Sequence, residues 1–176
     1  MIKYILVLSF FIFGCSHKSY IYIDIPKVTQ TMAKKEFGVK EISLPYYLEK
    51  SKIAYIENGK IKYFDSYFSS DAKSFATKRA INIFQTIYNN PVISLYPWES
   101  KSHNYIAIDI QKFISDKNKL YLVAKYSLYH DKKLINSHNY NKEITLKTFD
   151  EKTVTKQMQE MFDNFIKYIA RNIDAV

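Results

Sequence analysis

One side chain in this sequence stands where a definite chemical modification is expected. Cys15 is the only cysteine in the chain, and it follows an apolar run over 4–13. Lys3 precedes that run, and the small residue Gly14 stands directly before the cysteine. A positive charge, a short apolar stretch and a small residue at the cleavage point form the layout of a secretory signal. A cysteine at that point indicates a lipobox, in which Cys15 carries acyl chains and becomes the first mature residue.

Two other interpretations of this leader remain open. A membrane-spanning anchor needs about 20 apolar residues, whereas His17 and Lys18 follow the short run here. A leader that is cleaved without lipidation usually ends in a pattern such as Ala-x-Ala, which is absent. We therefore expect a lipoprotein signal peptide over 1–14, a short tether over 15–19 and one folded domain over 20–176. Ser16, rather than aspartate, follows the cysteine, which favours the outer membrane, with the domain facing the periplasm.

No other group of residues indicates catalysis. The four histidines match no zinc-binding spacing, and the sequence contains no serine-hydrolase elbow, His-Glu-x-x-His motif or glycine-rich phosphate loop. Asp65 and Asp109 are single acids in strand-like stretches, which is more typical of surface positions than of an acid/base pair. The sequence predicts no enzyme, no metal site and no cofactor, and it favours a binding or assembly role.

The charge of the chain is strongly positive. The formal net charge is +9, and the lysines are scattered along the sequence instead of forming one basic arm. For an exported protein this charge favours anionic lipid headgroups or acidic protein surfaces over nucleic acid. A solvated, lysine-rich surface without a specific partner is the simpler alternative.

The remaining pattern predicts two helices and a series of strands. Helices are expected over 71–89, with Asp71 as the N-cap, and over 149–173, with Thr148 and Glu151 forming a capping box. Strands are expected over 20–25, 37–42, 52–57, 60–65, 92–95, 104–115 and 120–130, followed by one that ends near 146. Asn58-Gly59 between alternating runs predicts a hairpin. The expected fold is α+β: a single domain with an antiparallel twisted sheet and both main helices packed on one face.

The last expected helix carries apolar residues at helical spacing, which predicts a stripe that faces the core. Its members are Val154, Met158, Met161, Phe162, Phe165, Ile166, Ile169 and Ile173.

Four short stretches, in order, resemble those of a known family. The first is Cys15 followed closely by a strand, and the second is Leu44-Pro45-Tyr46-Tyr47-Leu48, which runs into the strand at 53–56. The third is Tyr96-Pro97-Trp98, and the fourth is the strand segment from Ile108-Asp109 to Phe113. Together they resemble the PqiC-like, ABC-type transport auxiliary lipoproteins, which accompany MCE-domain lipid transport systems.

The resemblance implies a non-enzymatic accessory subunit of an ABC/MCE-type lipid transport system between the inner and outer membranes. It implies an MCE-domain protein and an ABC permease and ATPase as partners, with the membrane held through acylated Cys15, and it is compatible with a homo-oligomer. The alternative is a stand-alone structural envelope lipoprotein without a transporter partner. We expect the motif residues to serve mainly in packing, with Pro97 fixing a corner and Trp98 plugging the edge of the sheet.

Overall fold

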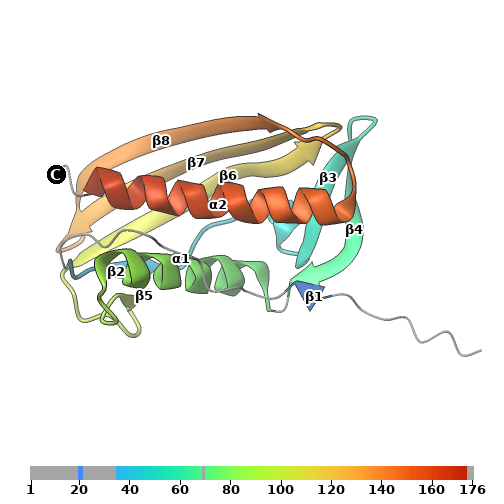
Figure 1. Cartoon of the computed structure of the whole chain (residues 1–176). Helices are drawn as coiled ribbons and strands as arrows, with labels where there is room; N and C mark the ends of the chain where they lie inside the picture. Colours follow the sequence, from blue (N-terminus) through green and yellow to red (C-terminus); the bar gives the residue numbers. More distant parts are fainter. Residues whose placement is uncertain (1–19, 22–34, 69, 174–176) are drawn as a thin grey trace, which may run out of the picture.

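The computed structural model describes residues 20–21, 35–68 and 70–173. A layer of two helices lies on one face of a curved, eight-stranded sheet (Figure 1). This confirms the single-domain α+β fold with two helices on one face. The elements, in chain order, are β1 (Tyr20–Ile21), β2 (Gly38–Lys40), the 3₁₀ turn η1 (Tyr46–Leu48), β3 (Lys52–Glu57), β4 (Lys60–Phe68), α1 (Ala72–Tyr88), β5 (Ser94–Tyr96), β6 (Asn104–Asp116), β7 (Lys119–His130), β8 (Lys133–Thr145) and α2 (Glu151–Ile173).

The sheet is mixed, which corrects the expectation of antiparallel strands throughout. β6, β7 and β8 form the expected antiparallel meander, and β3 and β4 form the expected hairpin. However, β2 and β3 both run parallel to β6, β5 runs parallel to β2, and β1 runs parallel to β4. Parallel neighbours need long crossover connections, and the crossover between the β3–β4 hairpin and β5 is α1 itself.

The β3–β4 hairpin turns where the sequence predicts. Asn58 and Gly59 have φ angles of 52° and 72°, so both residues adopt the positive φ that a two-residue turn of this kind requires. The short pairing of Tyr20–Ile21 with Tyr67–Phe68 confirms the start of the first expected strand. The rest of that strand lies outside the described residues.

α1 begins and ends through its own side chains and backbone. The Asp71 carboxylate accepts a hydrogen bond from the Ser74 N–H at 2.9 Å, which confirms the predicted N-cap. Hydrogen bonding from the Ser74 side chain, and then from its backbone N–H, holds the pKa of Asp71 below its usual value. The helix ends at Asn89, which adopts the left-handed conformation, and the Asn90 N–H then bonds back to the Gln85 carbonyl at 3.0 Å.

α2 begins differently from the prediction. Asp150, rather than Thr148, caps the helix, because its Oδ1 accepts from the Thr153 N–H at 2.9 Å. The Thr148 hydroxyl donates to the Asp150 carboxylate, and these hydrogen bonds lower the pKa of Asp150 to about 2. Glu151 does not complete a capping box; its Oε1 accepts from the Ser66 N–H of β4 at 2.8 Å. The start of α2 is therefore tied to the sheet.

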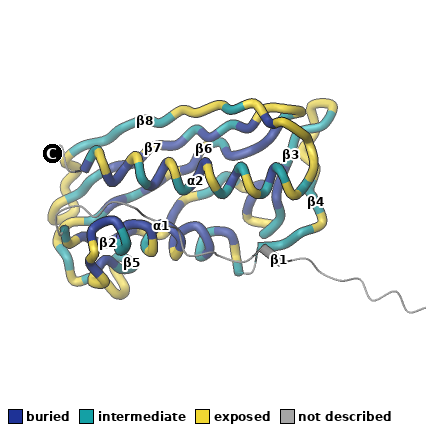
Figure 2. The backbone as a smooth tube through the Cα atoms, in the orientation of Figure 1, coloured by how far each residue is buried: buried dark blue, intermediate teal, exposed yellow. Residues whose placement is uncertain are grey.

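The core lies between the helices and the sheet (Figure 2). Every member of the predicted α2 stripe is buried, which confirms that this stripe packs in the core. Full burial of a side chain such as Phe165 contributes about 1.5–3 kcal/mol relative to leaving it exposed. The inward face of α1 is buried in the same way.

Candidate functional site

Two of the four family-like stretches meet in space. The stretch around η1 approaches β6, and the Phe113 N–H donates a hydrogen bond of 2.9 Å to the Tyr47 hydroxyl. On this edge of β6, Ser43 bridges to Asp109 and β3 pairs only from Ser115 onward. The Tyr47 hydroxyl therefore satisfies a buried backbone group where no ladder partner lies alongside. Burial raises the pKa of Tyr47, because it disfavours the phenolate.

The same two stretches line an apolar cavity of about 60 Å³. The cavity lies between the N-terminal halves of α1 and α2, against η1 and β6. Its lining is apolar apart from Arg79 on α1 and Thr155 and Gln159 on α2. Its apolar lining comes from the segment around η1, from β6, from the end of β4 and from both helices. These residues include Leu44, Leu48, Ile110, Phe113, Phe68, Phe75, Ala76, Met158 and Phe162.

A buried ion pair joins the two helices beside this cavity. Arg79 Nε and Nη2 donate to the two carboxylate oxygens of Asp163 at 2.5 and 2.6 Å. The side chains are only 3% and 14% exposed, so this pair is shielded from solvent. The two-pronged geometry suits a guanidinium and a carboxylate, and it fixes the separation of α1 and α2 at one wall of the cavity.

Asp109 does not take part in this site. It is exposed on β6, and its closest side-chain partner is the Gln111 amide, which donates at 3.4 Å. Asp65 is also exposed, and Lys52 Nζ lies 3.9 Å from its carboxylate. Both acids are surface residues, as the sequence predicts.

The Tyr96-Pro97-Trp98 stretch lies away from the cavity, at the end of β5. The Tyr96–Pro97 peptide bond is cis. Trp98 is 84% exposed, so the expectation that it plugs the edge of the sheet is wrong. The bend after β5 carries its ring into solvent instead.

Tyr96 covers the sheet in place of Trp98. Its ring stacks on Tyr105 with centroids 4.1 Å apart, and Tyr105 stacks on Tyr129 at 4.7 Å. Tyr96 also approaches Gly38 in β2 so closely that a Cβ there would lie 2.7 Å from the Tyr96 Cβ. Gly38 is required for this close approach.

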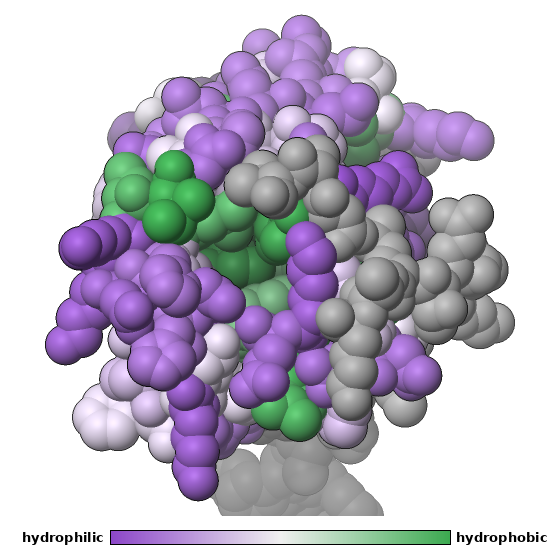
Figure 3. All heavy atoms as spheres, turned by 90° about the vertical axis from the view of Figure 1, so that its left-hand side faces the viewer, coloured by the Kyte–Doolittle hydropathy of each residue, from purple (hydrophilic) through white to green (hydrophobic). Residues whose placement is uncertain are grey.

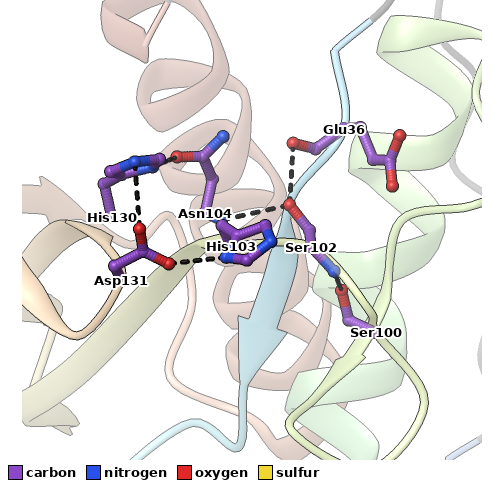
Figure 4. Close-up of polar contacts among 7 residues, drawn as sticks. All are labelled: Glu36, Ser100, Ser102, His103, Asn104, His130 and Asp131. Atoms are coloured by element: carbon purple, nitrogen blue, oxygen red, sulfur yellow. Dashed lines mark hydrogen bonds and ion pairs between the residues drawn. The ribbon is translucent and has the colours of Figure 1, made fainter.

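A polar cluster gathers where β6 begins and β7 ends (Figure 4). Asp131, in the β7–β8 turn, contacts His103 Nδ1 at 2.5 Å and His130 Nε2 at 3.4 Å, and His130 Nδ1 bonds the Asn104 amide oxygen at 2.8 Å. All are exposed, and the His103 hydrogen bond holds the pKa of Asp131 below its usual value. The sequence analysis missed this grouping. One sequence signal points to it. His103-Asn104 stands at the start of one expected strand and His130-Asp131 at the end of the next, and these positions lie side by side when the two strands pair antiparallel.

A broad hollow opens on the face shown in Figure 3, and Asn104 of the polar cluster is one of its lining residues. Its volume is about 380 Å³, with Phe37, Ile106 and Leu128 among its apolar lining residues and Lys35 and Glu36 among its charged ones. Within the described ranges, no three histidine, cysteine or acidic side chains lie close enough to hold a metal ion.

Cys15, the predicted lipidation site, lies outside the described residues. Of the helices that the structure describes, none combines the length and apolarity needed to cross a bilayer.

The comparisons with known proteins rest on structure. No family model and no curated protein matches the sequence. A crystal structure of an uncharacterised protein is similar over 89% of this chain and 98% of its own, with 14% identity and a TM-score of 0.69. A Xanthomonas campestris protein of the family DUF330 is similar over 86% and 91%, with 12% identity and a TM-score of 0.70.

A dodecameric PelC from Paraburkholderia phytofirmans is more distant, with 9% identity over 79% of this chain and 90% of its own and a TM-score of 0.44. At these identities the first two likenesses define a shared α+β fold. The class that the fold and site define is therefore a single-domain α+β protein with an apolar cavity beneath two helices.

Proposed function

We propose that this chain is a lipid-anchored, periplasm-facing accessory subunit of an ABC/MCE-type lipid transport system, held at the outer membrane through acylated Cys15. It carries no catalytic role in this proposal. The MCE-domain protein and the ABC permease and ATPase of the same system are its partners.

The single observation that carries the proposal is the meeting of two family-like stretches. The stretch 44–48 and the strand segment 108–113 are far apart in the chain, yet the Tyr47 hydroxyl and the Phe113 N–H are hydrogen-bonded. Leu48 and Phe113 line one cavity. Stretches that resemble one family by chance have no reason to share a site, so this contact supports the resemblance. The fold likeness to the DUF330 protein is compatible with it.

The membrane anchor is tested by cell fractionation. Cys15→Ala removes the thiol that lipidation requires, so the folded domain is expected in the soluble fraction. Ser16→Ala is the matched control, because it changes the neighbouring residue and leaves the thiol intact. Mass spectrometry of the native protein is expected to show an acylated Cys15 at the mature N-terminus. An intact leader or an unmodified thiol would overturn the anchor.

The partners are tested by affinity capture of the lipidated chain from detergent-solubilised envelopes. Recovery of an MCE-domain protein with its permease and ATPase is the expected result. Recovery of the chain without any of them supports the alternative, a stand-alone structural envelope lipoprotein. The Cys15→Ala chain serves as the control for capture that does not depend on the membrane.

A further inference from the structure

We propose that the cavity between the N-terminal halves of α1 and α2 binds the end of one acyl chain of a membrane phospholipid. The inference rests on the proposed membrane anchorage, but not on the identity of the transporter partners. It gives the protein a direct contact with lipid, which the accessory role by itself does not require.

The chemistry of the cavity selects an alkyl chain. Phe75, Met158 and Phe162 are among its apolar lining residues, and Thr155 and Gln159 are half-buried wall residues that also reach solvent. Arg79 is engaged by Asp163, so its charge is already compensated. A water molecule needs two or more polar partners to remain in a cavity, and this lining does not supply them. An apolar guest, in contrast, loses no hydrogen bond on entering.

The size of the cavity limits what enters. A cavity needs roughly 10–15 Å³ to hold one water molecule. The cavity volume of 60 Å³ therefore has room for several water-sized groups. That space accommodates the terminal methylenes of a chain and excludes a ring system or a headgroup. Two small side chains on α1, Ala72 and Ala76, leave the space open. The unbranched Met158 opposite them adapts to a variable guest.

The position of the cavity brings it close to the bilayer. Ile21 pairs with Phe68, and Phe68 lines the cavity. Four residues lie between Cys15 and Tyr20, so five Cα–Cα steps separate them, which corresponds to a reach of at most about 18 Å. β1 therefore lies beside the cavity, and the length of the chain between Tyr20 and Cys15 limits how far the cavity can be from the lipid-bearing cysteine. The hollow at the opposite end has charged residues in its lining, including Lys35 and Glu36, which suit an acyl chain less well.

The test uses photocrosslinking in vesicles. Palmitoyl-oleoyl phosphatidylglycerol vesicles carry a phosphatidylcholine with a diazirine near the methyl end of one chain, and they are mixed with native lipidated protein or with the Cys15→Ala chain. Peptide mass spectrometry is expected to place the label on the α1 and α2 segments that line the cavity, in both proteins. Label found only on exposed segments would overturn the proposal.

Cavity-filling variants provide the control. Ala76→Leu occupies the space, so labelling of the cavity segments should be lost, and thermal unfolding should show that the domain still folds. Ala72→Leu is a second filling variant in case the first does not fold. Asn82→Leu adds the same side chain at an exposed position of α1 and should leave labelling unchanged. Equal labelling in the filled and control variants would contradict the site.

The same experiment identifies the source of the acyl chain. Labelling of the Cys15→Ala chain but not of the native protein would mean that the protein's own N-terminal acyl chain fills the cavity, and it would overturn the phospholipid assignment. Affinity capture of the transporter partners does not depend on this result. The inference and the proposed function can therefore fail separately.

Discussion

The two ends of this molecule use the same kinds of polar groups in opposite surroundings. At the cavity end, Arg79–Asp163 and Tyr47–Phe113 are polar contacts that are shielded from water. At the far end, Asp131 and its two histidine partners form comparable contacts on the surface, and Trp98 stands in solvent. Removing water raises the cost of losing a polar partner. We therefore expect substitutions at the cavity end to affect folding, and matched substitutions at the far end to leave it nearly intact.

The largest effect is expected for the buried ion pair. Arg79→Met leaves the Asp163 carboxylate buried without its partner, which should lower the free energy of unfolding by about 3–5 kcal/mol. Urea unfolding followed by circular dichroism measures this loss. Asp131→Asn is the control at the far end, because Asp131 is exposed and Asn tolerates its positive φ. Similar losses in the two variants would remove the contrast between the ends.

The second prediction compares the loss of stability when the hydroxyl is removed from each of two buried tyrosines. Tyr47→Phe leaves the buried Phe113 N–H without its acceptor and should cost about 1–3 kcal/mol. The Tyr126 hydroxyl has no hydrogen-bond partner among the described residues, although it is fully buried. Tyr126→Phe should therefore be neutral or stabilising. The two variants are compared by urea unfolding at neutral pH, and a larger loss for Tyr126→Phe would contradict the prediction.

Alkaline pH sharpens the second comparison. Burial raises the pKa of Tyr126 from 10.0 to about 12. Below pH 10 the folded and unfolded chains both keep this proton, so its contribution to stability is fully present. As the pH rises from 10 towards 12, the unfolded chain loses the proton first and the free energy of unfolding falls. Unfolding curves across this range should fall less steeply for Tyr126→Phe, and identical slopes would contradict the assignment to Tyr126.

The smallest effect is expected at Trp98. Because its ring is 84% exposed, Trp98→Ala should change the free energy of unfolding by no more than about 0.5 kcal/mol. Thermal unfolding by calorimetry provides the measurement, with Phe162→Ala in the cavity wall as the buried counterpart. A substantial loss of stability in Trp98→Ala would mean that the far end is packed more tightly than its exposure indicates.

Local patterns predicted the elements of this fold well. The α2 stripe, the Asp71 cap and the Asn58-Gly59 turn depend on residues within a few positions of one another, and each lies where the sequence predicts. The capping box failed at the same local level. Thr148 has the right spacing to Glu151, but Asp150 is a competing acceptor that stands nearer the first free N–H groups, and Ser66 of a distant strand engages Glu151.

The candidate site was only partly predictable. The stretches 44–48 and 108–113 were singled out by resemblance, and nothing in either one indicates that Tyr47 would accept from the Phe113 N–H. That contact arises because the edge of β6 is shared between β2 and β3 with a gap between them. The exposure of Trp98 also depends on distant residues. Tyr96, two positions earlier, packs against Gly38 and stacks on Tyr105, so Tyr96 covers the sheet there and Trp98 does not.

The sequence by itself determined the helices, most of the strands, the residues that face the core and the single-domain α+β class. Hydrophobic periodicity and turn chemistry act over short stretches of chain, so they can be read without a partner. The tertiary structure alone decided which strands run parallel, that Arg79 reaches Asp163, and that an apolar cavity remains beneath the helices. Each of these depends on how segments that are far apart in the chain pack against one another, and local sequence patterns carry no information about that packing.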